Sequence, residues 1–128
     1  MHQSFVQRSV LLFALTLLIA AAGCAVFNRD PHTRAIFTSG DLQVIRPTTP
    51  RQGVAAAVKA MDDLQFGIVS KQADHEQGQV KARTPSDRSI VVETHNLGGG
   101  ATKITIRVGQ YGDEQISETI YQTMRRYF

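Results

Sequence analysis

The sequence predicts an α+β domain, an antiparallel sheet of four to five strands with two amphipathic helices on one face, in the order β-α-β-β-β-β-α. Four short runs between residues 66 and 108 carry apolar residues at every second position, and turn-forming residues close each run. Two flanking segments carry apolar residues at intervals of three and four, which is the helical pattern. Because short connections join antiparallel neighbours, the simplest solution places both helix stripes on the dry face of one sheet.

The first 23 residues have the three parts of a secretory signal peptide. A polar start carries Arg8, an apolar run spans residues 10–22, and small residues close the segment. As a helix, this run would span about 20 Å, whereas a hydrocarbon core of about 30 Å requires ~20 residues. We therefore expect residues 1–23 to be removed, with cleavage between Gly23 and Cys24.

Cys24 is the single cysteine of the chain. The ending Ala21-Ala22-Gly23-Cys24 resembles the lipobox of bacterial lipoproteins, in which the cysteine sulfur carries diacylglycerol. Lipidation would also consume a thiol that is unusual in an exported protein. The alternative is a small apolar residue at the end of an ordinary signal peptide or in an uncleaved membrane anchor.

The lipobox resemblance implies a protein held on a membrane by acyl chains, such as palmitate, at Cys24. Ala25, and not an aspartate, follows the cysteine. The sorting rule of bacterial lipoproteins then implies passage to the outer membrane, with the domain facing the periplasm. We therefore expect a cell-envelope protein whose first partner is membrane lipid.

Removal of residues 1–23 leaves a chain of the size of one domain. Residues 24–38 are aperiodic and contain Asp30-Pro31, which favours a lipidated N-terminus and tether, and residues 39–128 form the single predicted domain. The mature part keeps 13 of the 14 basic residues and all 11 acidic ones, a small excess. Nucleic-acid binders cluster Lys and Arg with interleaved aromatic residues, so no nucleic-acid partner is expected.

The first strand is expected within residues 37–46, with an interruption near residues 39–41. The first helix begins at Thr49 as N-cap, with Pro50 at the first helical position and Gln52 completing a capping box, and it ends near Gln65. Its apolar stripe consists of Val54, Ala57, Val58, Met61 and Leu64. We assign this stripe to the core rather than to a partner, because the domain is small.

The four strand runs span residues 66–73, 79–84, 89–95 and 101–108, and the turns span residues 74–78, 85–88 and 96–100. Alternation predicts a dry face made of Val80, Ala82, Ile90, Val92, Ile104, Ile106 and Val108. The opposite face carries Lys81, Arg83, Glu93, His95, Lys103, Thr105 and Arg107. One side of the sheet is therefore expected to be buried and the other hydrated.

The closing segment, from Asp113 onward, is the second predicted helix. Asp113 is placed to cap it, and Arg125 and Arg126 lie at its C-terminal end, as the helix dipole favours. Its apolar stripe consists of Ile116, Ile120, Met124, Tyr127 and Phe128. Gly112 allows a tight reversal out of the preceding strand.

Together, these features resemble a family of small bacterial lipoproteins of unknown function. The resemblance covers most of residues 50–128 and is most specific in the motif R-V-G-x-x-G-D-x-x-x-S-x-x-I at residues 107–120. Residues 25–48 match only loosely. The resemblance implies lipidation at Cys24 and brings no activity and no catalytic residue.

No pattern predicts catalysis, a cofactor or a metal. Asp74-His75-Glu76 offers ligating groups, but adjacent turn residues do not converge on one ion. The glycines at 98–100 lack the Lys-Ser or Lys-Thr that opens a helix in a phosphate loop. Ser117 lies within a helix, and the histidines lie apart in the sequence, so no catalytic triad is predicted. An enzyme is the weakest hypothesis.

The hydrated sheet face is the candidate binding surface, with Lys81, Arg83, Lys103 and Arg107 as its candidate ligand-binding residues around Glu93 and His95. One interpretation is a solvated face whose charges pair across strands for a few tenths of a kcal/mol each. The other is a shallow site for an anionic envelope polymer or for another envelope protein. The sequence thus favours an envelope-anchored interaction or structural module, monomeric as a soluble domain, with an anion-binding module as the alternative.

Overall fold

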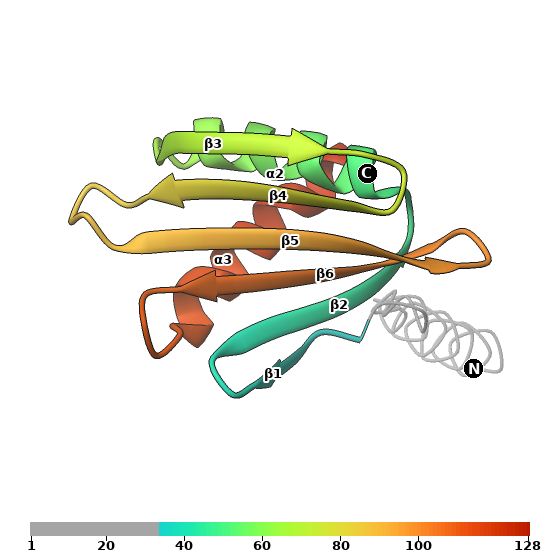
Figure 1. Cartoon of the computed structure of the whole chain (residues 1–128). Helices are drawn as coiled ribbons and strands as arrows, with labels where there is room; N and C mark the ends of the chain where they lie inside the picture. Colours follow the sequence, from blue (N-terminus) through green and yellow to red (C-terminus); the bar gives the residue numbers. More distant parts are fainter. Residues whose placement is uncertain (1–33) are drawn as a thin grey trace, which may run out of the picture.

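A computed structural model describes residues 34–128 of the chain. It contains one six-stranded antiparallel sheet, ordered β1-β2-β6-β5-β4-β3, with two α-helices behind it (Figure 1). The elements are β1 (Ile36–Thr38), β2 (Asp41–Pro47), α2 (Pro50–Asp63), β3 (Gly67–Ala73), β4 (Gln77–Arg83), β5 (Ser89–Gly98), β6 (Ala101–Val108), α3 (Glu114–Met124) and the 3₁₀ turn η1 (Arg125–Tyr127). The predicted class and element order are confirmed, with six strands where four to five were predicted.

The additional strand comes from a hairpin at the start of the domain. The strand predicted within residues 37–46 is in fact two strands, β1 and β2, joined at Ser39 and Gly40. Both residues have positive φ, 53° and 86°, as two-residue hairpin turns require. The interruption predicted near residues 39–41 is this turn, and the sheet begins at Ile36, within the segment predicted as tether.

The predicted signal peptide, the cleavage site between Gly23 and Cys24, the lipidation of Cys24 and most of the tether lie outside the described residues. Within residues 34–128, no helix is both long and apolar enough to cross a membrane.

The predicted start of α2 is confirmed. The Thr49 hydroxyl accepts a hydrogen bond from the Gln52 backbone N–H at 3.2 Å, and the Gln52 side-chain oxygen accepts one from the Thr49 N–H at 3.3 Å. Pro50 follows the cap, where its missing N–H costs nothing. The helix ends at Asp63, and the chain reverses at Gln65, whose φ is 57°.

Small residues make most of the buried face of α2. Its buried members are Pro50, Gly53, Val54, Ala56, Ala57, Ala60 and Met61, whereas Val58 and Leu64 of the predicted stripe are only partly buried. A Cβ on Gly53 would collide with the Thr94 side chain of β5. The small side chains therefore let this helix lie close to the sheet.

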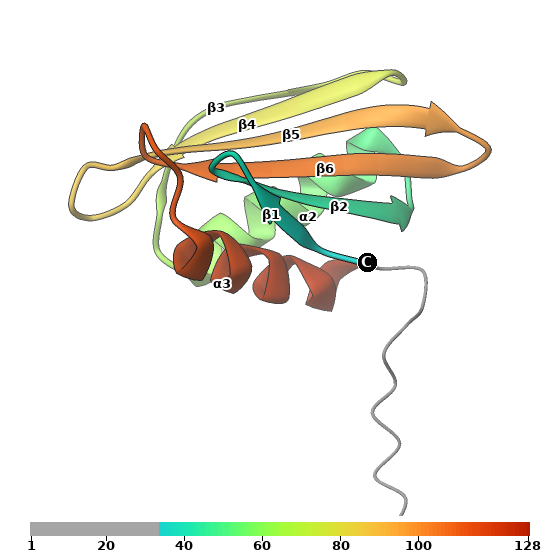
Figure 2. The ribbon, with the colours of Figure 1, turned by 90° about the horizontal axis from the view of Figure 1, so that it is seen from below.

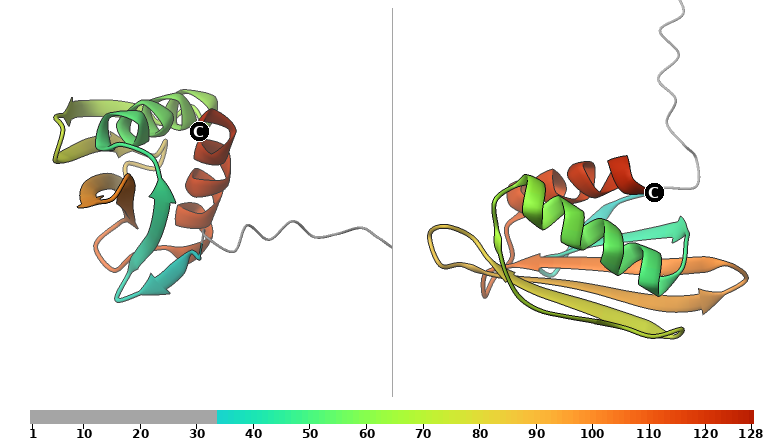
Figure 3. Two further views of the ribbon diagram at one scale, coloured as in Figure 1. Left: turned by 90° about the vertical axis from the view of Figure 1, so that its right-hand side faces the viewer. Right: turned by 90° about the horizontal axis from the view of Figure 1, so that it is seen from above.

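The predicted dry face of the sheet is confirmed. All its predicted members are at most 2% exposed, and two residues of β2 also belong to it. The buried face thus consists of Leu42, Val44, Val80, Ala82, Ile90, Val92, Ile104, Ile106 and Val108. α2 packs mainly over β3, β4 and β5, and α3 packs over β2 and β6 (Figure 3). The core is thus one layer between sheet and helices, and no helix formed by residues 34–128 covers the other sheet face (Figure 2).

The cap and stripe of α3 are as predicted up to Met124. One carboxylate oxygen of Asp113 accepts a hydrogen bond from the Ile116 backbone N–H at 2.9 Å. Ile120 and Met124 are fully buried, and Ile116 packs against the core.

The last residues differ from the prediction. The chain tightens into η1, which changes the angular spacing of the side chains. Tyr127 and Phe128 are more than a third exposed, so their assignment to the buried stripe is wrong. Instead, the Tyr127 hydroxyl donates to the Asp63 carboxylate, and the Phe128 ring lies 4.5 Å from the Arg46 guanidinium of β2.

Candidate binding surface

The sheet face opposite the helices is exposed, and the four candidate cations lie on it. We call it the open face, defined as the strand side chains that point away from α2 and α3. Alternation along β4 places Lys81 and Arg83 there, and alternation along β6 places Lys103 and Arg107 there.

The four cations do not form one site. The register aligns Lys81 with Val91 and Val91 with Arg107, so the two cations share a row with a valine between them. Lys103 is aligned with His95, four residues along β5 from Val91, which is about 14 Å at ~3.4 Å per residue. A small anion would therefore meet one of these charges at a time.

Two of the four cations are engaged by carboxylates. Arg83 lies 3.0 Å from Asp87, and the Arg107 Nε donates to Asp41 at 2.7 Å. Arg107 also donates to the Ser39 carbonyl at 3.0 Å, and its hydrogen bond to Asp41 raises the pKa of the guanidinium. Arg107 thus ties β6 to the β1–β2 turn and supports the fold.

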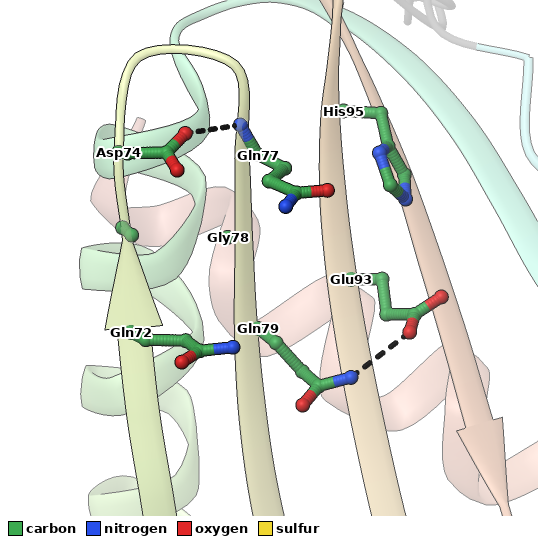
Figure 4. Close-up of a pocket in the computed structure, with 8 residues that line it drawn as sticks. Gln72, Asp74, Gln77, Gly78, Gln79, Glu93 and His95 are labelled. Atoms are coloured by element: carbon green, nitrogen blue, oxygen red, sulfur yellow. Dashed lines mark hydrogen bonds between the residues drawn. The ribbon is translucent and has the colours of Figure 1, made fainter.

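Lys81 and Lys103 have no carboxylate within salt-bridge distance among residues 34–128. Near them, the open face contains a hollow of about 350 Å³ (Figure 4). Its polar side chains come from three neighbouring strands and one turn, and they are Gln72, Asp74, Gln77, Gln79, Glu93 and His95. The Gln79 amide donates to Glu93 at 2.9 Å. The hollow therefore offers amide, carboxylate and imidazole groups side by side.

Sequence reasoning named Glu93 and His95 but missed the three glutamines of this hollow. Gln77 and Gln79 stand two positions apart in β4, and the hairpin register sets Gln72 opposite Gln79. The period-two spacing was visible in the sequence, whereas the pairing across β3 and β4 required the register.

Asp74 shapes the turn at the rim of the hollow. Its carboxylate accepts hydrogen bonds from the Gln77 and Glu76 backbone N–H groups, both at 2.8 Å. Both bonds lower the pKa of Asp74, and the one from Gln77 has the larger effect. Among residues 34–128, no three His, Cys, Asp or Glu side chains gather as metal ligands would.

A second hollow, of about 360 Å³, lies between the start of α2 and the tip of the β5–β6 hairpin. The glycines at positions 98–100 form this tip, all with positive φ, so they make a hairpin turn. The capping box of Thr49 and Gln52 occupies the helix start. This arrangement differs from a phosphate loop, in which the glycines lead directly into the helix.

Asp113 and Ser117 are the distinctive polar residues of the C-terminal motif; Asp113 is hydrogen-bonded within the fold, and Ser117 is buried. Arg88 donates to Asp113 at 2.9 Å, although the nearest charges in the sequence are Arg107 and Glu114. Both hydrogen bonds lower the pKa of Asp113, and the one from the Ile116 N–H has the larger effect. Ser117 is fully buried, so its hydroxyl cannot meet a substrate.

These features define an α+β domain with a one-sided core and a polar open face. The chain belongs to the family described as "Protein of unknown function (DUF3568)", which matches residues 8–126. The expected membership in a family of unknown function is thereby confirmed. Comparison with curated proteins found no match.

Proposed function

We propose that this chain is a lipoprotein of the bacterial cell envelope whose domain is an interaction module without a catalytic site. The observation that carries the proposal is Cys24, the single cysteine, placed directly after an apolar run too short to span a bilayer. Acylation of its sulfur would hold the domain at a membrane. The residue that follows, Ala25, favours the outer membrane, with the domain facing the periplasm.

Intact-mass spectrometry of membrane-extracted protein tests the anchor. The expected product begins at Cys24 and carries added acyl mass, and a Cys24→Ser variant should lack it. An unmodified thiol at Cys24, or retention of residues 1–23, would contradict the lipoprotein assignment.

The shape of the domain supports contact through the open face rather than through strand addition. β1 is only three residues long. β3, at the other edge, has an irregular register between Ile68 and Ser70 and carries Lys71. Short, irregular or lysine-bearing edges resist pairing with a further strand. The open face remains as a surface that neither α2 nor α3 covers.

Crosslinking in solubilised envelopes tests the interaction role. We expect a stoichiometric partner protein whose crosslinks are lost in Gln79→Lys, which changes a residue that lines the hollow of the open face. The matched control is Gln115→Lys, at an exposed position of α3. Loss in both variants, or in neither, would contradict contact through this face.

The hollow favours a second candidate function, the binding of an anionic envelope polymer that also carries hydroxyl groups. Amides and carboxylates hydrogen-bond hydroxyls, and Lys81 and Lys103 are positioned near the hollow for acidic groups. Binding should weaken with salt and in Lys103→Gln, and should persist in Arg83→Gln, because Arg83 is already paired. Salt-independent binding would contradict this alternative.

A further inference from the structure

Charge is distributed unequally between the two ends of the domain. The ion pairs formed among residues 34–128 are Arg83–Asp87, Arg88–Asp113 and Arg107–Asp41. All three lie at the end that holds the β1–β2 and β4–β5 turns and the start of α3 (Figure 1). At that end, cations and carboxylates neutralise one another.

The opposite end is where β1 begins, and we call it the tether end. It is formed by the start of β1, the end of β2, the β5–β6 hairpin and the C-terminus (Figures 1 and 2). Its cations have no carboxylate in salt-bridge distance among the described residues, and they are Arg34, Arg46, Arg51, Lys103, Arg125 and Arg126. Asp74 and Glu76 also lie at this end, in the β3–β4 turn across the sheet from β1. The β1 side of the tether end is therefore positively charged.

Arg46 is the most unusual of these cations. Its guanidinium lies 4.5 Å from the centre of the Phe128 ring and donates to the Tyr121 hydroxyl at 3.2 Å. Its Nε is buried and has no hydrogen-bond partner among the described residues. The buried Nε is out of reach of a bilayer, but the guanidinium lacks an anion, and its remaining N–H groups are suited to a phosphate oxygen because such groups form strong charge-assisted hydrogen bonds.

Apolar side chains are exposed among these cations. Ile36, Ile45 and Leu97 are each about half exposed, and Phe128 is 39% exposed. Ile45 is aligned with Lys103 across β2 and β6 on the open face, whereas Arg46, the next residue of β2, lies on the helix side of the sheet. Exposed apolar residues interleaved with Lys and Arg are typical of surfaces that rest on a lipid bilayer.

The tether would keep this end close to lipid. Nine residues separate Cys24 from Arg34, and a chain of this length reaches at most about 35 Å when fully extended. A surface confined in this way meets the membrane at a high effective concentration, so weak individual contacts suffice to populate a docked state.

We propose that the tether end of the domain docks on an anionic phospholipid surface, with Arg46, Arg125 and Arg126 contacting phosphates and Ile36, Ile45 and Leu97 entering the headgroup region. This inference rests on the proposed lipid anchor. Docking directs the β4–β5 turn away from the membrane and leaves most of the open face accessible to a partner.

The single cysteine makes the test direct. Once Cys24 carries lipid, a thiol introduced by Leu97→Cys at the tether end or by Ser86→Cys at the far end is the one free thiol for an environment-sensitive fluorophore. The labelled, lipidated mature protein is reconstituted in vesicles of phosphatidylcholine with phosphatidylglycerol, and in vesicles of phosphatidylcholine alone. In the anionic vesicles, we expect the emission of a fluorophore at position 97 to shift to shorter wavelength and to be quenched by nitroxide lipid. A fluorophore at position 86 should show neither change.

Charge variants sharpen the test. Replacing Arg125 and Arg126 by Gln removes two cations from the tether end and should reduce the ratio of docked to undocked protein about thirtyfold, since each cation near an anionic surface contributes about 1 kcal/mol. The matched control replaces Lys81 and Arg83 by Gln, which removes the same charge elsewhere and should leave the signal unchanged. Added salt should also abolish docking.

The outcomes separate this inference from the anchor. Protein that carries no lipid at Cys24 by intact mass contradicts the proposed function and the docking together. Protein that carries the lipid but gives equal signals at positions 97 and 86 overturns the docking and leaves the anchor intact. A signal at position 97 that appears only after envelope proteins are added also overturns it, because the occupant would then be a protein.

Discussion

At the scale of single residues, Asp113 joins two distant parts of the domain through one carboxylate. One oxygen caps α3 by accepting the Ile116 N–H, and the other accepts Arg88 from the β4–β5 turn. We predict that Asp113→Ala, which loses both bonds, lowers Tm by about 4–8 °C. Asp113→Asn keeps a capping oxygen and should lower it less. Thermal unfolding followed by circular dichroism measures both variants, and an equal Tm for all three proteins would contradict the capping role.

The same carboxylate predicts a pH dependence. The fold lowers the pKa of Asp113 below its ordinary value of 3.8, so folding favours the ionised form. Its stabilising contribution is complete above the ordinary pKa and is lost as the pH falls through the lower pKa of the folded state. The Tm of the wild type should therefore fall on acidification below about pH 4, and more steeply than that of Asp113→Asn. If Tm fell equally with pH in both proteins, Asp113 would not contribute to the pH dependence of stability.

For Ser117 we predict the opposite effect, a gain in stability on substitution. Its hydroxyl is fully buried and has no hydrogen-bond partner among the described residues. Because an unsatisfied buried polar group is costly, Ser117→Ala should raise the free energy of unfolding by about 1 kcal/mol. Urea unfolding measures the change. A clear loss of stability in Ser117→Ala would indicate that the hydroxyl has a partner, such as a buried water.

At the scale of elements, the connection from β6 to α3 rests against the β1–β2 turn. Gly112 has a φ of 84°, and a Cβ at this position would collide with the backbone of Gly40. Two elements that are far apart in the sequence therefore approach closely at a pair of glycines, which explains the glycine before the Asp113 cap.

We predict that Gly112→Ala lowers the free energy of unfolding by more than about 2 kcal/mol, because it combines backbone strain with a collision that neither backbone can avoid. The matched control is Gly99→Ala, where φ is also positive but nothing lies within 4 Å, and a cost of about 1 kcal/mol is expected. Urea unfolding compares the two. Equal costs would mean that the close approach of the two turns contributes nothing.

At the scale of the whole molecule, helices and sheet cover one another and leave a single core. We predict that residues 34–128 fold cooperatively as a monomer without the anchor. A fragment of residues 39–128, which follows the predicted domain boundaries, lacks β1. It therefore also lacks the Phe37 side chain, which packs against the core. That shorter fragment should be less stable by about 1–3 kcal/mol. Sedimentation and urea unfolding test both fragments, and an obligate dimer or equal stability would contradict the prediction.

Features that depend on neighbouring residues were predictable from the sequence. The start of α2 at Thr49, Pro50 and Gln52 follows from hydrogen bonds between residues three apart. The dry face of the sheet follows from alternation, which the pleat imposes on any strand buried on one side. The cap of α3 at Asp113 likewise involves a partner three residues away. The split of the first strand was less visible, because β1 is only three residues long.

The sequence by itself therefore determined the class of the domain, its element order, its core and the caps of its helices, all of which arise from short-range chemistry. Only the tertiary structure decided which charges meet. β2 lies beside β6 in the sheet, so Asp41 reaches Arg107, 66 residues away, and Arg88 reaches Asp113, 25 residues away. The same strand order paired one of the four candidate cations, Arg107, and placed three glutamines around one hollow, whereas Arg83 pairs locally with Asp87, four residues away. Such contacts depend on the register and order of strands that are distant in sequence, and no local pattern encodes them.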